Sequence, residues 1–279
     1  MRVRAIKDLS RLSDPRLFEE IACGLDLVMK NVARLVAGAA TLRESNQVHA
    51  GRVLSALADE EAAKYLILLD AVRCPRKPPH LLPGQLSRFN EHLAKGLYAR
   101  ASGYRPVRLK DLQDYIDHDR DSHYLDGPND VDYIMRNEII QGREGLLYVD
   151  YVQYDEDYHW TDPSRFEDML AVLPESHSGQ VARSLHSSGL GGPEALATIA
   201  SVWRSATIDA DTHIQAIWKL NHQTLTALEA KALLKAQPQD VYAWIVQNWQ
   251  FPMYGLDLSE IRVELDDLRG RRNNWTPDF

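Results

Sequence analysis

The apolar residues of this chain recur at three- and four-residue steps over long stretches, and this period constrains the fold more than any other feature. It covers residues 17–42 and then 45–73, and each stretch predicts one long amphipathic helix. Asp14 and Pro15 precede the first stretch and are typical of a helix start. Sustained strand-like alternation is absent from the sequence, so the chain is predicted to be all-α.

Shorter periodic stretches predict the remaining helices, and proline-rich or acidic segments separate them. "CPRKPPHLLPG" ends the second helix, because its prolines cannot continue one. A third helix is expected over residues 85–102, and a fourth from about Asp130, with Met135 and Ile139 on its apolar side. In the C-terminal part, helices are expected to begin at Pro193 and to cover residues near 211–235 and 239–249.

A break in the helical period suggests a domain boundary. "YVQYDEDYHWTDP" is aromatic and acidic and closes on Pro163. We therefore expect a helical bundle over residues 1–165 and a smaller helical region over residues 166–279. Five tryptophans lie in the second part, and their bulk predicts that they anchor its core.

Composition excludes several classes of protein. The chain has 279 residues and a formal net charge of -8, which argues against a general nucleic-acid coat or a membrane-surface protein. No apolar run is long enough to cross a bilayer, and the N-terminus lacks the apolar core of a signal peptide. Cys23 and Cys74 are too few for a disulfide framework. We expect a reduced cytoplasmic protein without a cofactor or a bound metal.

The second predicted helix contains charges within an apolar run, "LADEEAAKYLILLD". Glu61 falls near the centre of the apolar stripe, whereas Glu60 and Lys64 lie along its edge. A carboxylate in a buried face costs several kcal/mol unless it is paired or neutralised. The pattern therefore predicts that Glu61 is largely buried and belongs to a polar network with a cation from another helix.

Two further polar sets are candidates for that network. Arg88, His92 and Lys95 line the polar side of the third predicted helix, and Arg143, Tyr148 and Asp150 stand in "QGREGLLYVDY". We expect Arg143, in preference to Lys95 or His92, to reach the Glu61 carboxylate. A plain salt bridge between helices would explain the same residues without any function.

Several motifs occur in an order that resembles a known family. "NVARLVAGAATL", "ALADEEAAKYLILLD", "FNEHLAKGLY", "REGLLYVDY" and "WTDP" are similar to motifs of the AbiV family of bacterial abortive-infection proteins, a branch of the HEPN superfamily. The resemblance covers roughly residues 17–163. Ala63 stands where the family pattern prefers Gly before the lysine of its "EE" motif. The resemblance implies a HEPN-like helical bundle, followed here by an additional C-terminal helical region.

The resemblance also implies a function. Family members defend bacteria against phage by arresting growth or translation, and many HEPN proteins are metal-independent ribonucleases that use Arg-x(4-6)-His. The implied catalytic candidates are Arg143, Tyr148, His92 and Arg88, and the RNA would be tRNA or mRNA. Tyr148 replaces His in the Arg-x4 spacing, and a phenol is a poor base at neutral pH. The alternative is a non-catalytic helical module that binds a phage or host translation protein.

Three other segments support weaker functional hypotheses. Asp-x3-His spacing occurs twice in "DYIDHDRDSHYLD", so a metal could bind there, although scattered His in acidic loops is common. "GLGGPE" lacks the Lys-Ser/Thr of a phosphate loop. "RGRRNNW" is a small basic patch that is typical of a solvated tail.

Assembly is predicted from the resemblance and from charge. HEPN-type sites are commonly completed by a second subunit, which implies a homodimer. The face that carries Arg88, His92 and Lys95 is expected to be basic in an otherwise acidic protein. Two such faces would form a cationic groove that attracts phosphate.

Overall fold

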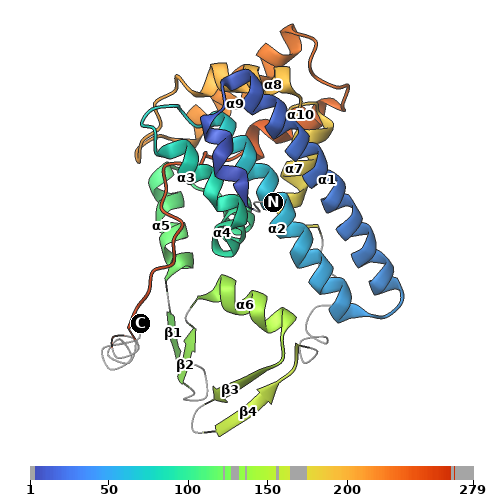
Figure 1. The fold of residues 1–279 in the computed structure, drawn as a ribbon, viewed down its shortest axis with the longest axis vertical. Helices are drawn as coiled ribbons and strands as arrows, with labels where there is room; N and C mark the ends of the chain where they lie inside the picture. The colour runs from blue at the N-terminus through green and yellow to red at the C-terminus, as the bar shows by residue number, and fades with distance from the viewer. Residues whose placement is uncertain are drawn as a thin grey trace.

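Two long helices form the spine of the molecule. In a computed structural model, residues 4–121, 123–126, 132–135, 137–154, 157–163, 175–264 and 267 are described. Helix α1 (Asp14–Glu44) begins with Pro15 in its first turn, and helix α2 (Val48–Arg73) returns alongside it (Figure 1). Both helices lie where the apolar period predicts them.

The other elements surround this pair. They are η1 (Ala5–Arg11), α3 (Leu81–Ser87), η2 (Arg88–Asn90), α4 (His92–Gly103), α5 (Leu109–Arg120), β1 (His123–Asp126), β2 (Asp132–Met135), α6 (Glu138–Leu147), β3 (Asp150–Tyr154), β4 (Asp157–Thr161), α7 (His177–Ser187), α8 (Pro193–Trp203), α9 (Ile214–Ala230) and α10 (Gln239–Asn248). The all-α prediction is confirmed, because the strands of the described residues form only two separate two-stranded hairpins.

The core lies around α2. Its stretch from Ala62 to Arg73 is buried except for Lys64, because α1, α4, α7 and α8 all pack against this helix. Leu17, Ile21 and Leu25 of α1 are at most 1% exposed and belong to the same cluster. Each such side chain contributes about 1.5–3 kcal/mol by burial. Among the described residues, no helix is both long and apolar enough to span a membrane.

The third helix differs from its prediction. Residues 85–102 were expected to form one helix, but the chain breaks into α3, η2 and α4, with extended backbone at Glu91. The break turns Arg88 inward, where its guanidinium donates hydrogen bonds to the carbonyls of Met253 and Leu256. The prediction of one helix was wrong because a tertiary contact with a distant segment outweighs local helix propensity.

The segment before α6 is also corrected. Helix was expected from about Asp130, yet Asp132–Met135 is strand β2, paired antiparallel with β1. Helix α6 begins at Glu138 because the Asn137 side chain accepts a hydrogen bond from the backbone N–H of Ile140 at 3.0 Å. The predicted irregular segment after α6 forms the hairpin of β3 and β4.

The C-terminal helices share the core of the bundle. Helix α7 packs on α2 and α4, and α8 packs on α1. Trp203 and Trp249 are nearly fully buried, as expected for core anchors, whereas Trp275 lies outside the described residues. The helix that was predicted to begin at Pro193 does begin there. The division at residue 165 stays a prediction.

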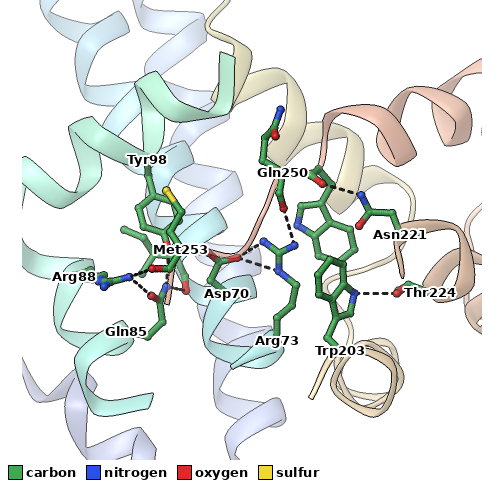
Figure 2. A network of polar contacts seen from close by, with 12 residues as sticks. Asp70, Arg73, Gln85, Arg88, Tyr98, Trp203, Asn221, Thr224, Gln250 and Met253 are labelled. Atoms are coloured by element: carbon green, nitrogen blue, oxygen red, sulfur yellow. Dashed lines mark hydrogen bonds and ion pairs between the residues drawn. The ribbon is translucent and has the colours of Figure 1, made fainter. Parts of the chain in front are cut away.

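A buried polar network joins the C-terminal segment to the bundle (Figure 2). The Asp70 carboxylate accepts hydrogen bonds from Arg73, from the Tyr98 hydroxyl at 2.7 Å and from the backbone N–H of Met253 at 2.8 Å. The Arg73 guanidinium lies 4.5 Å from the ring centre of Trp203 and 4.7 Å from that of Trp249. This network therefore stabilises the contact between α2 and the residues after α10.

Gln85 and Arg88 extend the same network. Gln85 donates hydrogen bonds to the Tyr98 hydroxyl and to the carbonyl of Ile67, both at 2.8 Å, and accepts one from Arg88 at 2.7 Å. Burial, and after it the Asp70 charge, raise the pKa of Tyr98 well above its ordinary value. The phenol therefore stays protonated and acts as a donor to Asp70.

Candidate functional site

Three side chains from two helices meet at the Glu60 carboxylate of α2. The Lys95 Nζ lies 2.5 Å from Glu60 Oε2, and His92 Nδ1 lies 3.0 Å from the same oxygen. Arg143 Nε donates to Glu60 Oε1 at 2.7 Å. We call Glu60, His92, Lys95 and Arg143 the Glu60 cluster. It joins α2, α4 and α6, which lie far apart in the sequence.

The cluster is buried at its centre and open at one side. Lys95 and Glu60 side chains are 6% and 15% exposed, Arg143 is 25% exposed and His92 is 51% exposed. Burial opposes the ionisation of Glu60, but hydrogen bonds from Lys95 and Arg143 outweigh it and hold the pKa of Glu60 below its ordinary value of 4.5. Glu60 is therefore an anion at neutral pH, and His92 is the most exposed member of the cluster.

Local sequence and close packing explain how the cluster forms. His92 and Lys95 stand three residues apart in the first turn of α4, so they share one face of that helix. Helix α6 approaches α4 at Gly96, where an added Cβ would overlap the Cγ2 of Ile139. The absence of a side chain at Gly96 thus lets α6 come close enough for Arg143 to reach Glu60.

The structure corrects the predicted carboxylate. Glu61 was expected to be largely buried and to pair with a cation from another helix, Arg143 in preference. Its side chain is largely buried as expected, with 18% exposed against 15% for Glu60, but it pairs with Lys64 of its own helix. Lys64 also lies over the ring of Phe89, 5.1 Å from its centre. The expected partner was wrong because α2 packs on several sides, so the edge that carries Glu60 faces α4 and α6 and Arg143 binds Glu60.

Three other predicted residues are placed away from the Glu60 cluster. Arg88 is 8% exposed and binds the C-terminal segment, so it does not share a solvated face with His92. Tyr148 follows α6 and is 58% exposed. Asp150 begins β3, where its carboxylate accepts a hydrogen bond from the backbone of Tyr151. The described contacts join none of the three to Glu60.

The hydrogen bonds of the cluster assign a role to each nitrogen of His92. A carboxylate only accepts, so Nδ1 carries the proton that it donates to Glu60. The Lys95 Nζ lies 3.2 Å from Nδ1, but an ammonium group has no lone pair and cannot accept this proton. Lys95 Nζ and His92 Nδ1 both bind Glu60 Oε2. In the neutral imidazole this assignment leaves the lone pair on Nε2, and the His92 side chain is half exposed. The cluster can therefore exchange a proton at Nε2 beside two cations.

The basic face predicted for dimerisation is not formed. Of its three residues, Arg88 and Lys95 are buried and each binds partners within the chain. His92 alone of the three is exposed. The charge argument for a shared cationic groove is therefore wrong, and the homodimer stays a prediction from the family resemblance.

The part of the alternative metal site that the structure describes is not assembled. Asp114 pairs with Lys110 on the surface of α5, and Asp119 accepts a hydrogen bond from Arg100. Within the described residues, no three His, Cys, Asp or Glu side chains gather so that they could hold a metal ion. The basic segment "RGRRNNW" lies outside the described residues.

Comparison with known proteins identifies the family. A sequence model of the AbiV family, HEPN_AbiV, matches residues 20–169, which is more than half of the chain. The chain belongs to the AbiV family of the HEPN superfamily. No curated protein and no solved structure gives a match.

The matched part of this AbiV-family protein contains the whole Glu60 cluster. Membership implies a defence function of the abortive-infection type. The sequence motifs contain all four members of the cluster, but the helical period pointed to Glu61 in place of Glu60. It did not single out Gly96, although a glycine inside an amphipathic helix often marks a close approach between elements.

Proposed function

We propose that this AbiV-family protein is a cytoplasmic phage-defence effector that arrests growth or translation of the host by cutting RNA at the Glu60 cluster. The observation that supports the proposal is the convergence of His92, Lys95 and Arg143 on one carboxylate, with the imidazole exposed. Proton transfer and charge neutralisation are the two things that metal-independent RNA cleavage requires of a protein.

The chemistry follows from the position of each group. His92 Nε2 takes the proton of a ribose 2′-hydroxyl, and the 2′-oxygen attacks the adjacent phosphorus. The bond to the 5′-oxygen breaks, this oxygen takes a proton from solvent, and a 2′,3′-cyclic phosphate remains. Glu60 stabilises the imidazolium that forms through its bond to Nδ1.

Charge supports phosphate binding at this position. The cluster sets two permanent cations, Lys95 and Arg143, against one carboxylate, so it is locally positive in a chain of formal net charge -8. Arg143 uses Nε for Glu60, which leaves its outer nitrogens for a phosphate in the bidentate geometry that guanidinium favours. RNA rather than DNA is the substrate because it carries its own nucleophile.

The test is cleavage of purified tRNA and mRNA in the presence of EDTA. We expect cleavage by the native protein and a loss of about 100-fold or more in His92→Ala. His222→Ala is the matched control, because His222 is an exposed histidine on α9 outside the cluster. Circular dichroism checks that both variants stay folded. Equal cleavage by His92→Ala and the native protein contradicts the proposal.

The second candidate function is the non-catalytic binding module. An exposed aromatic surface on the β3–β4 hairpin favours it, because such surfaces recognise other molecules. A protein that leaves RNA intact yet still blocks phage growth supports this candidate, with a phage or host translation protein as the partner.

Light scattering tests the homodimer in the same preparation: a mass near 31.7 kDa excludes it.

A further inference from the structure

The β3–β4 hairpin carries three aromatic side chains on one face. Tyr151 and Trp160 are directly opposite in the antiparallel register, and their ring centres are 5.0 Å apart. Tyr158 lies two residues before Trp160 and therefore on the same face, with its ring centre 6.0 Å from that of Tyr151. We call Tyr151, Tyr158 and Trp160 the aromatic face.

This face is exposed to solvent. The exposed fractions are 53% for Tyr151, 59% for Tyr158 and 71% for Trp160. Figure 1 places the hairpin at the end of the molecule opposite α8 and α9. Large aromatic side chains gathered on a surface are typical of an interaction site, since a folded chain ordinarily buries them. Within the described part of the chain, none of these three rings belongs to the hydrophobic core.

The charge around the aromatic face selects the kind of partner. Residues 148–163 contain five carboxylate residues and no Lys or Arg. Asp150 is exposed at the start of β3, on the opposite face of the hairpin from Tyr151 by strand alternation. These charges repel phosphate, so the face is unsuited to RNA although its rings could stack on bases. Aromatic rings on a segment of negative charge instead favour Arg and Lys, through cation–π contacts and charge attraction.

The backbone of the hairpin offers a further means of binding. Among the described residues, β3 and β4 pair only with each other, so each strand has an outer edge without a neighbouring strand. An extended segment can add to such an edge through main-chain hydrogen bonds while its alternate side chains contact one face. A segment with a basic residue at every second position would thus place its cations over the aromatic face.

We propose that the β3–β4 hairpin docks an extended Lys/Arg-rich segment of a partner protein. The binding surface consists of Tyr151, Tyr158 and Trp160, on a hairpin segment whose sequence carries carboxylates and no Lys or Arg. This surface does not include the Glu60 cluster, so the proposal does not depend on RNA cleavage. It names a partner chemistry that the defence function leaves open.

The test uses a fluorescein-labelled peptide of alternating arginine and glycine and measures fluorescence anisotropy with the full chain. We expect saturable binding that weakens as salt increases, and about tenfold weaker binding by the double variant Tyr151→Ala/Trp160→Ala. Asp150→Asn should reduce the salt dependence. Leu27→Ala and Glu229→Gln are the controls, because they change an exposed apolar and an exposed acidic residue elsewhere.

Three outcomes overturn the proposal. One is equal binding of the peptide by the double variant and the native chain, provided that circular dichroism shows both to be folded. Another is preferential binding of a labelled single-stranded RNA that depends on Trp160. The third is that the peptide binds only after Arg269, Arg271 and Arg272 are changed to Ser, because the chain's own basic segment is then the occupant. Loss of RNA cleavage alone leaves the binding result intact and concerns the Glu60 cluster.

Discussion

Asp70→Asn should destabilise the protein strongly, because it removes the charge at the centre of the buried network. The Asp70 and Arg73 side chains are 2% and 3% exposed. Asp70 accepts from Arg73, Tyr98 and the backbone of Met253, so it holds three elements together. An asparagine has the same shape but turns an –NH2 group toward donors. The change therefore tests charge and hydrogen bonding rather than packing.

The structure sets the expected size of this effect. Breaking a buried ion pair by removing one partner costs about 3–5 kcal/mol, since the other charge stays buried. Arg73 keeps part of its stabilisation, because Nη1 still donates to the carbonyl of Gln250 at 2.9 Å and the guanidinium stays between two indoles. We therefore expect a loss near 3 kcal/mol, which is a large share of the roughly 5–15 kcal/mol that stabilises a folded protein.

Urea unfolding followed by circular dichroism measures the effect as a change in the free energy of unfolding. The matched control is Asp114→Asn, whose ion pair with Lys110 is on the surface, with side chains 59% and 61% exposed. Such a pair contributes less than about 1 kcal/mol. In a double-mutant cycle with Arg73→Met, the double variant should lose less than the two single losses combined. If Asp70→Asn costs no more than the surface control, the reasoning about this network is wrong.

Two further predictions concern the Glu60 cluster. Because the pKa of Glu60 is lowered in the folded protein, its stabilising contribution is present above about pH 4.5 and is lost as pH falls through the folded pKa. The difference in unfolding free energy between the native protein and Glu60→Gln should therefore shrink on acidification. Urea unfolding at a series of pH values measures this difference. A difference that does not change with pH contradicts the ion pairs of Glu60. Gly96→Ala should displace α6, because the added Cβ would overlap Ile139, and should lower RNA cleavage without changing any charge. Gly142→Ala is the control: an added Cβ there has no atom within contact distance, so cleavage should stay unchanged.

Local sequence signals predicted several elements of the fold well. The apolar period and Pro15 predicted α1 and α2, and Pro193 predicted the first residue of α8. These signals work because each depends on neighbours within one or two turns. The same signals were misleading over residues 85–102, where Arg88 binds carbonyls of a segment more than 160 residues away.

For the candidate site, too, local signals predicted one part correctly and missed the part that depends on tertiary contacts. Residue types and their order pointed to His92, Lys95 and Arg143 around an acidic pair, and the structure brings these three together. Helical phase alone assigned the carboxylate to Glu61, because it treats a helix as having one buried face. Helix α2 packs on several neighbours, so the face at Glu60 is enclosed as well. The aromatic face was not predicted, because its cross-strand register depends on the hairpin turn.

The sequence by itself determined the all-α class, the positions of the long helices and the set of residues from which a site could be built. Each follows from apolar periodicity, capping residues and composition, which act over a few residues or over the whole chain. Only the tertiary structure decided that Arg143 binds Glu60, that Arg88 is buried and that Asp70 is the centre of the core network. These pairings join residues far apart in the chain, and they depend on how α4, α6 and the C-terminal segment pack around α2.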